Sequence, residues 1–525
     1  MAGGIFFGIN IGVKALRAQQ TAISVTGHNI ANANTPGYSR QVANMQTGFA
    51  IPVPSNNRWK GAGQLGTGVE ISEVKRIRDH FIDWQIRAES GVLNEWQTRH
   101  DTLSQIETVF LEPSATGISN LMSAFWNSWQ ELSKFPESSP VRTTVKETGI
   151  ALAEAFRHSY ARLETIEEGL DRQMEIAIND ANSLLRQIAS LNEQIKFIKT
   201  GGDNPNDLLD KRDLLLDRLS RLMDIEVKDV TALVAGRIIA TGEVTVGVRT
   251  TDINGAPALL NIIDPSLASR HLKFERNGLA ITVQDSVNDT HTLAANTGEV
   301  FGIQRAGNDT SPDSTSVAYY KNKLDIFAEG ISRILNEIHS SGINLKEPPD
   351  DTGIAFFVFK DELGNVIDVS DPAMEDYLSA KYLFLNPDIE KDVGFIAAGK
   401  VDSGEPFNPG NRENALAIAQ LRNARFTLDA NGKLISSTVG DLRFETFYQN
   451  FVAEVGVATK EAERMIQNQT TLVNQLTNRK EQVSGVSIDE ETANMISYHR
   501  AFQAASRYIM VLDELAATIV NGLKA

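Results

Sequence analysis

The sequence has 525 residues, enough for roughly three to four domains of about 150 residues each. It contains no cysteine, which excludes disulfides, thiolate nucleophiles, cysteine-ligated zinc and iron–sulfur clusters. The 50 basic and 67 acidic residues give a net charge of −17, so we expect no nucleic-acid partner. No segment has the run of about 18 uncharged apolar residues that a membrane span requires.

The first part of the chain predicts an amphipathic helix and no cleaved secretory signal. Its first basic residue, Lys14, follows an apolar run at 5–13, whereas a secretory signal places its charges before that run. An apolar row recurs every seven positions and consists of Ile9, Leu16, Ile23 and Ile30. This spacing is typical of a coiled-coil seam, so the helix needs a partner.

A helix stop follows, in a segment that contains Asn32, Thr35, Pro36, Gly37, Tyr38, Ser39 and Arg40. Pro36 disfavours helical backbone at Thr35. Pro36 and Gly37 at the two central positions of a four-residue turn predict a type II turn with positive φ at Gly37. On these residues alone, the segment is an ordinary end of a helix.

Three further helices are predicted before residue 200. Apolar residues at helical spacing occupy 86–110 and 118–132. A longer heptad stripe runs over 156–198 and predicts a helix roughly 65 Å long, at about 1.5 Å per residue. We therefore expect an elongated protein.

The period changes near residue 224, where strands become favoured. The strand-like runs lie at 225–230, 237–248 and 272–283. Asn277 and Gly278 predict a type I′ hairpin. A helix returns at 317–339, and 350–426 has the Gly, Pro and Asp content of β structure and loops. We predict a β-rich body inserted into a helical stem.

Helical periodicity returns at 444–476 and again near the C terminus. The last part of the chain has two apolar rows, formed by Met495, Phe502, Ile509 and Ala516 and by Tyr498, Ala505, Leu512 and Ile519. This seam predicts that the two chain ends pair. No acidic residue precedes Glu70, whereas acidic residues are frequent after 480. Ion pairs between Lys14 or Arg17 and Asp513 or Glu514 would support this pairing, unless these charges are simply solvated.

No catalytic, cofactor or metal site is predicted. Gly61, Gly63 and Gly66 have the spacing of a dinucleotide-binding loop, but no strand precedes them. Gly394, Gly399 and Lys400 lack the hydroxyl residue that completes a phosphate-binding loop. The eight histidines are scattered, with no pair on one helical turn. We therefore expect a protein that is not an enzyme.

The turn segment at 31–38 reads ANANTPGY and resembles the signature of the axial proteins of the bacterial flagellum. Its continuation, Ser39 and Arg40, is similar to that of the hook–filament junction proteins of this family. The segment at 206–213, NDLLDKRD, resembles an interior element of the same proteins. The segment at 484–494 is similar to their SGVxxDEExAN motif, with signature residues Ser484, Gly485, Val486, Asp489, Glu490, Glu491 and Asn494.

The resemblance implies a structural protein that forms the ring between hook and filament and provides the base for filament assembly. It implies export through the flagellar type III apparatus and an extracellular location in the flagellum. The implied partners are other copies in the ring, the hook protein, a second hook-associated junction protein, and a cytoplasmic export chaperone at the C-terminal helix. The implied assembly interface is the set of heptad rows on the two terminal helices.

The expected fold is multidomain and mainly α. A terminal coiled coil would comprise 1–40 with 485–525, and an elongated helical bundle would comprise 41–223 with 438–484. An inserted β-rich, α+β outer region would occupy 224–437. Two alternatives stay open, namely another axial subunit of hook or rod type and an adhesin on a coiled-coil stalk.

Overall fold

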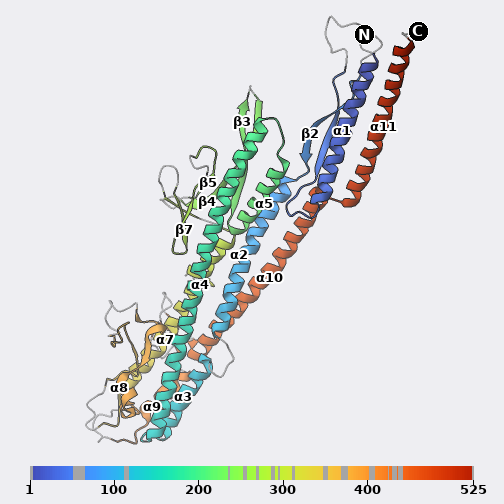
Figure 1. The fold of residues 1–525 in the computed structure, drawn as a ribbon. Helices are drawn as coiled ribbons and strands as arrows, with labels where there is room; N and C mark the ends of the chain where they lie inside the picture. Colours follow the sequence, from blue (N-terminus) through green and yellow to red (C-terminus); the bar gives the residue numbers. More distant parts are fainter. Residues whose placement is uncertain are drawn as a thin grey trace.

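The computed structural model is an elongated molecule with both chain ends at one tip (Figure 1). Long helices form its stem, and a sheet lies beside the longest of them. This confirms the predicted fold class, a mainly α stem with an inserted region that contains β structure. The structure describes residues 4–50, 65–110, 117–234, 237–251, 257–267, 271–284, 290–293, 296–309, 314–346, 353–367, 377–400, 408–423, 425–428, 434–435 and 442–522.

The stem is built around one long helix, α4 (Ser139–Thr200), which has 62 residues. It begins with Pro140 in its first turn, where a missing N–H has no consequence, and it ends before Gly201. The predicted heptad stripe lies within α4, and its members from Phe156 to Ala177 are buried. The other stem helices are α2 (His80–Phe110), α3 (Ile118–Lys134), α5 (Asn206–Leu222) and α10 (Phe444–Ser484).

The two chain ends form a separate pair of helices, α1 (Ile5–Asn32) and α11 (Ile488–Gly522), which lie side by side. A hairpin of β1 (Gln41–Thr47) and β2 (Val69–Arg76) packs beside α1. This hairpin lies in the range predicted as helical bundle. It is antiparallel and carries a register shift between Asn44 and Met45.

The inserted region begins with an antiparallel sheet that packs on α4. The sheet order is β3-β4-β8-β7-β6, and β5 pairs with β4. The predicted strand runs are present, but the third divides into β6 and β7. Their turn is formed by Gly278 and Leu279, one residue later than predicted, and Gly278 has φ 61°. The strands are β3 (Ile225–Val234), β4 (Arg237–Thr251), β5 (Pro257–Ile263), β6 (Phe274–Asn277), β7 (Ala280–Gln284) and β8 (Thr290–Leu293).

The rest of the inserted region mixes helices with short strands. The predicted helix at 317–339 is α7 (Val317–Ser340), which follows α6 (Glu299–Asn308). Two short helices, α8 (Pro387–Lys391) and α9 (Glu413–Gln420), occur where β structure and loops were predicted. The side chain of Asn386 caps α8. The short strands are β9 (Gly342–Ile343), β10 (Phe357–Phe359), β11 (Leu383–Leu385), β12 (Gly399–Lys400), β13 (Arg425–Leu428), β14 (Leu434–Ile435) and β15 (Leu442–Arg443).

The buried apolar core is unevenly distributed along the molecule. One continuous cluster joins the stem helices, α7 and the sheet, and it includes Trp129 and Phe125, which are fully buried. In the described parts of α1 and α11, the buried apolar side chains are those of Ala18 and Ala22. The terminal pair therefore has almost no core of its own.

Candidate functional site: the contact between the two chain ends

The two terminal helices approach closely because α1 has small residues where α11 has large ones. A Cβ at Gly8 would lie 2.8 Å from Leu512 Cδ1, and a Cβ at Gly12 would lie 2.5 Å from Ile509 Cγ1. Both distances are too short for a side chain. Glycine at these two positions therefore lets the side chains of α11 pack against the backbone of α1.

The structure brings most of the predicted seam residues into this contact region. The half-buried residues of the predicted rows are Ile9, Leu16, Ile23, Ile30, Met495, Tyr498, Phe502, Ala505, Ile509, Leu512 and Ala516. Ile519 is 51% exposed. The fully buried positions on α1 lie beside the predicted row and are Gly12, Ala18, Ala22, Thr26 and Asn29. The covered face of α1 is thus a face of small and polar residues.

Apolar side chains on the outer side of the terminal pair face solvent. On α11, Met510 is 60% exposed and Val511 is 55% exposed. On α1, Phe6 is 81% exposed. Exposed large apolar side chains on both helices of the pair favour contact with another molecule.

We predicted that Lys14 or Arg17 pairs with acidic residues of α11, and this prediction is wrong for Lys14. Its ammonium group contacts Glu70 on β2 instead. The chain ends are joined by charge at the other end of α1, where Arg40 pairs with the buried carboxylate of Glu491; the carboxylate of Glu490, which also contacts Arg40, is exposed. The hairpin, whose position was not predicted, places an acid nearer to Lys14 than α11 does.

The signature turn after α1 has the predicted geometry. Gly37 has φ 79°, and Tyr38 N–H donates to the carbonyl of Thr35 at 3.2 Å. The side chain of Asn32 donates to the carbonyl of His28 at 3.0 Å and closes the helix end. Thr35 Oγ1 donates to Asn32 Oδ1 at 3.2 Å. This turn directs the chain from α1 back toward the start of α11.

A buried polar cluster, here called the end latch, connects the two signatures. It consists of Asn29, Tyr38, Arg40 and Glu491. Glu491 is 2% exposed and accepts from Arg40 Nε at 2.7 Å and from Asn29 Nδ2 at 3.0 Å. Asn29 Oδ1 accepts from Tyr38 Oη at 2.7 Å and from Gln41 N at 3.0 Å. Burial raises the pKa of Tyr38, as do the carboxylates around it, so its hydroxyl stays a donor.

The C-terminal signature forms the bend between α10 and α11. The carbonyl of Ser484 accepts from Arg40 N–H at 2.9 Å, and Gly485 N–H donates to Glu481 O at 2.8 Å. Asp489 and Glu490 lie in the first turn of α11, where negative charge is favourable. Glu490 meets Arg40 at 3.2 Å from an exposed position. Of the other signature residues, Val486 and Asn494 are half-buried.

Ser39 joins the signature turn to the interior motif at 206–213. Its backbone N–H donates to Asp210 Oδ2 at 3.0 Å, and its hydroxyl donates to Asp210 Oδ1 at 2.8 Å. Asp210 lies on α5 and also pairs with Arg76 Nη1 at 2.7 Å. The motif is therefore next to the chain ends in space.

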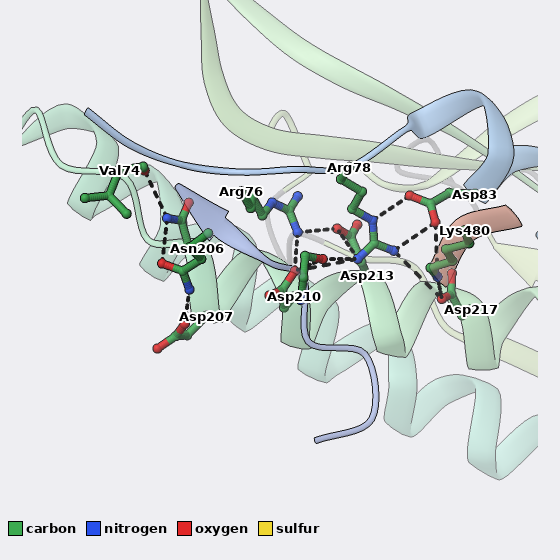
Figure 2. Close-up of polar contacts among 12 residues, drawn as sticks. Val74, Arg76, Arg78, Asp83, Asn206, Asp207, Asp210, Asp213, Asp217 and Lys480 are labelled. Carbon is green, nitrogen blue, oxygen red and sulfur yellow. Dashed lines mark hydrogen bonds and ion pairs between the residues drawn. The ribbon is translucent and has the colours of Figure 1, made fainter. Parts of the chain in front are cut away.

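Asp210 belongs to a larger ion-pair network, here called the ionic joint, at the top of the stem (Figure 2). Arg78 pairs with Asp83 at 2.5 Å through Nε, and Arg76 pairs with Asp213 at 2.7 Å. Lys480, from α10, reaches Asp83 at 3.1 Å. The joint links β2, α2, α5 and α10, and its members are Arg76, Arg78, Arg87, Lys480, Asp83, Asp210, Asp213 and Asp217.

The charges of the ionic joint balance, with four cations and four carboxylates. Burial alone would raise the pKa of Asp213, but Arg78, Arg76 and Arg87 hold that pKa well below its usual range. Burial also opposes ionisation of Asp83, and Arg78 with Lys480 lowers its pKa. Asp213 and Asp83 are therefore ionised in the folded protein at neutral pH.

The residues of the latch and the joint that were not predicted as site residues include Asn29, Arg76, Arg78, Asp210 and Asp213, although Asp210 and Asp213 lie in the motif at 206–213. For some of these residues, the spacing in the sequence does indicate that they share a face. The acids at 210, 213 and 217 share one helix face, and the arginines at 76 and 78 are two apart in an extended segment, on one side. Their mutual contact could not be read from either spacing alone.

Within the described residues, no cluster of three or more His, Cys, Asp or Glu side chains could hold a metal ion. None of the helices described is long and apolar enough to cross a membrane. Of the two glycine patterns, Gly61 and Gly63 lie outside the described residues. Gly399 is in β12 rather than in a phosphate-binding loop.

Three family models match separate parts of the chain. The model of the flagellar hook-associated protein FlgK helical domain matches residues 103–357. The model of the flagella basal body rod protein matches residues 9–38, and that of the flagellar basal body rod FlgEFG protein C-terminal matches residues 482–522. The last two matches cover most of α1, all of α11, the C-terminal signature and the N-terminal signature up to Tyr38.

Full-length relatives extend these matches over the whole chain. Flagellar hook-associated protein 1 of Bacillus subtilis is 31% identical over 99% of this chain and 98% of its own length. The protein of the same name from Salmonella typhimurium is 24% identical over 98% of this chain and 99% of its length. The hook junction protein FlgK from Burkholderia pseudomallei has a similar fold, with a TM-score of 0.56 and 14% identity over 76% of this chain and 100% of that one. The chain therefore belongs to the flagellar hook-associated protein 1 (FlgK) family, whose members are structural proteins of the bacterial flagellum.

Proposed function

We propose that this protein forms the junction ring between the flagellar hook and filament, with copies joined through the outer faces of α1 and α11. The ring provides the base on which the filament assembles. It contacts the hook protein on one side and a second hook-associated junction protein on the other. The protein has no catalytic role.

The observation that carries this proposal is that the two terminal helices are long but bury few apolar side chains. α1 has 28 residues and α11 has 35, yet Ala18 and Ala22 are the buried apolar side chains in their described parts. At about 25 cal/mol per Å² of apolar surface, burial against neighbouring copies is a large free-energy gain that a single chain does not obtain. Self-association of the terminal pair supplies this burial.

We place the three predicted units at different distances from the axis of the flagellum. The pair of 1–40 with 485–525 lies inside the axial tube, the bundle of 41–223 with 438–484 surrounds it, and the region at 224–437 projects outward. The chain reaches this extracellular position through the flagellar type III apparatus. A cytoplasmic chaperone binds the C-terminal helix before export, which covers its exposed apolar residues.

The test is deletion of the gene in the source organism, followed by electron microscopy of the cells and measurement of flagellin in the medium. We expect hooks without filaments and monomeric flagellin in the medium, both reversed by the native gene. Normal filaments and motility in the deletion strain would refute the junction role. Hooks that are themselves missing would indicate a rod or hook subunit instead.

A further inference from the structure

The seam between α1 and α11 does not select one register by itself. Its apolar rows repeat every seven residues, so a slide by one heptad, about 10.5 Å, presents the same rows again. Small residues also recur on or beside the covered face of α1, at Gly8, Gly12, Ala15, Ala18 and Ala22. A small residue recurs one heptad after Gly8, at Ala15, but Gln19 follows Gly12, so the shape of this face opposes a slide mainly at the contact of Gly12 with Ile509.

The end latch adds a contact that exists in one register. The carboxylate of Glu491 is buried between Arg40 Nε, at 2.7 Å, and Asn29 Nδ2, at 3.0 Å. Asn29 is 1% exposed, and both polar atoms of its amide are already hydrogen-bonded. Sliding α11 by a heptad would remove Glu491 from its partners and leave buried polar groups unpaired, which is strongly unfavourable.

Arg40 is a fixed reference point for this contact because its backbone is tied to the stem. Its N–H donates to the carbonyl of Ser484, at the end of α10, at 2.9 Å. Its carbonyl accepts from Ile77 N–H, between β2 and α2, at 2.8 Å. The latch therefore fixes the position of α11 relative to the stem as well as relative to α1.

We infer that Glu491, held by Arg40 and Asn29, fixes the register in which α1 and α11 pair, and thereby the shape in which the subunit enters the ring. This inference rests on the proposed function, since the ring is the assembly in which a common register matters. Buried polar contacts select register in other paired helices for the same reason, the penalty for leaving them unpaired. Glu491 is thus a positioning residue.

The absence of cysteine from the chain allows the register to be read from disulfide formation. A Cβ at Gly27 would lie 3.9 Å from Met495 Cε, so Gly27→Cys with Met495→Cys reports the register of the structure. Gly27→Cys with Phe502→Cys reports a slide by one heptad. Each pair is placed in the full-length chain, expressed in cells without the native gene, and oxidised in detached flagella. Glu491→Gln is compared with Glu490→Gln, whose carboxylate meets the same Arg40 but is 64% exposed.

With Glu491 present, we expect the 27–495 disulfide to exceed the 27–502 disulfide by about tenfold or more, and Glu490→Gln to leave this ratio unchanged. Glu491→Gln should lower the ratio about tenfold, which corresponds to about 1.4 kcal/mol of register preference. An unchanged ratio in Glu491→Gln would overturn the inference. An equal loss in Glu490→Gln would overturn it as well.

If Glu491→Gln forms no flagella, hydrogen exchange of the purified chain decides between two explanations. Unchanged protection of α2 and α4 would support a role confined to the chain ends. Reduced protection there would overturn the inference, because Glu491 would then act on general stability. Failure of the proposed function is distinguishable, since the native chain and Glu490→Gln would then also be missing from the flagella.

Discussion

The pair of Arg78 and Asp83 allows the strength of the ionic joint to be measured. Both side chains are 3% exposed, and they meet through two contacts, Nε to Oδ2 at 2.5 Å and Nη2 to Oδ1 at 3.2 Å. Arg78→Met would leave Asp83 with Lys480 alone and withdraw a cation from Asp213. Loss of one partner of a buried pair destabilises by about 3–5 kcal/mol.

The double variant Arg78→Met with Asp83→Leu removes both charges and should recover about 2 kcal/mol or more of this loss, because no carboxylate is left unpaired at that position. The matched control is the surface pair of Lys134 and Glu131, which meet at 2.8 Å with side chains 58% and 48% exposed. Its coupling should be about 0–1 kcal/mol.

Hydrogen exchange of peptides from α5 and the start of α2 reports the free energy of local opening at the joint. This value is measured separately from the opening of the sheet formed by β3 to β8. A double-mutant cycle on the four chains then gives the coupling between Arg78 and Asp83. A coupling as small as that of the surface pair would refute the reasoning, because burial would then add nothing to the contact.

Three further outcomes are expected. His339 donates through Nδ1 to Ile354 O and accepts at Nε2 from Ala397 N–H, and burial lowers its pKa from 6.5 to about 4. As the pH falls, the unfolded state binds this proton before the folded state does. The free energy of unfolding should therefore fall by about 3 kcal/mol between pH 6.5 and pH 4. His339→Gln should remove this pH dependence in urea denaturation, and an unchanged pH dependence in the variant would contradict the prediction. Gly37→Ala forces a side chain to φ 79° and should lower the free energy of unfolding by about 1–2 kcal/mol in the same assay, whereas no change would argue against the turn. Phe502→Asp and Leu512→Asp place a charge in the seam and should give cells with hooks and no filaments, while circular dichroism shows the β body folded; normal filaments from both would reject the seam.

The helices and the signature turn were determined by the sequence, because their causes are local. The heptad stripe at 156–198 predicts the middle of α4, and the rows after 495 predict α11. Pro36 and Gly37 predict the turn, and Gly37 has the positive φ that it requires. Periodicity and turn chemistry act over a few residues, so they can be read without knowledge of the rest of the chain.

The family assignment also followed from sequence, since the resemblance rests on short motifs at both ends and in the interior. The division into strands was predicted less well. The hairpin of β1 and β2 was missed, and α9 formed where β structure was expected. Short segments of this kind take the conformation that their neighbours in space favour, which local propensity does not contain.

Only the tertiary structure decided which residues of the site meet. Arg40 and Glu491 are 451 positions apart, and Ser39 and Asp210 are 171 positions apart, so their contacts depend on the path of the whole chain. The partner of Lys14 was mispredicted for the same reason. Heptad spacing identified a seam on α1 but not its covered face, because the approach of α11 is set by how closely Gly8 and Gly12 let it pack. Periodicity defines a face that can be buried, and the folded chain decides what buries it.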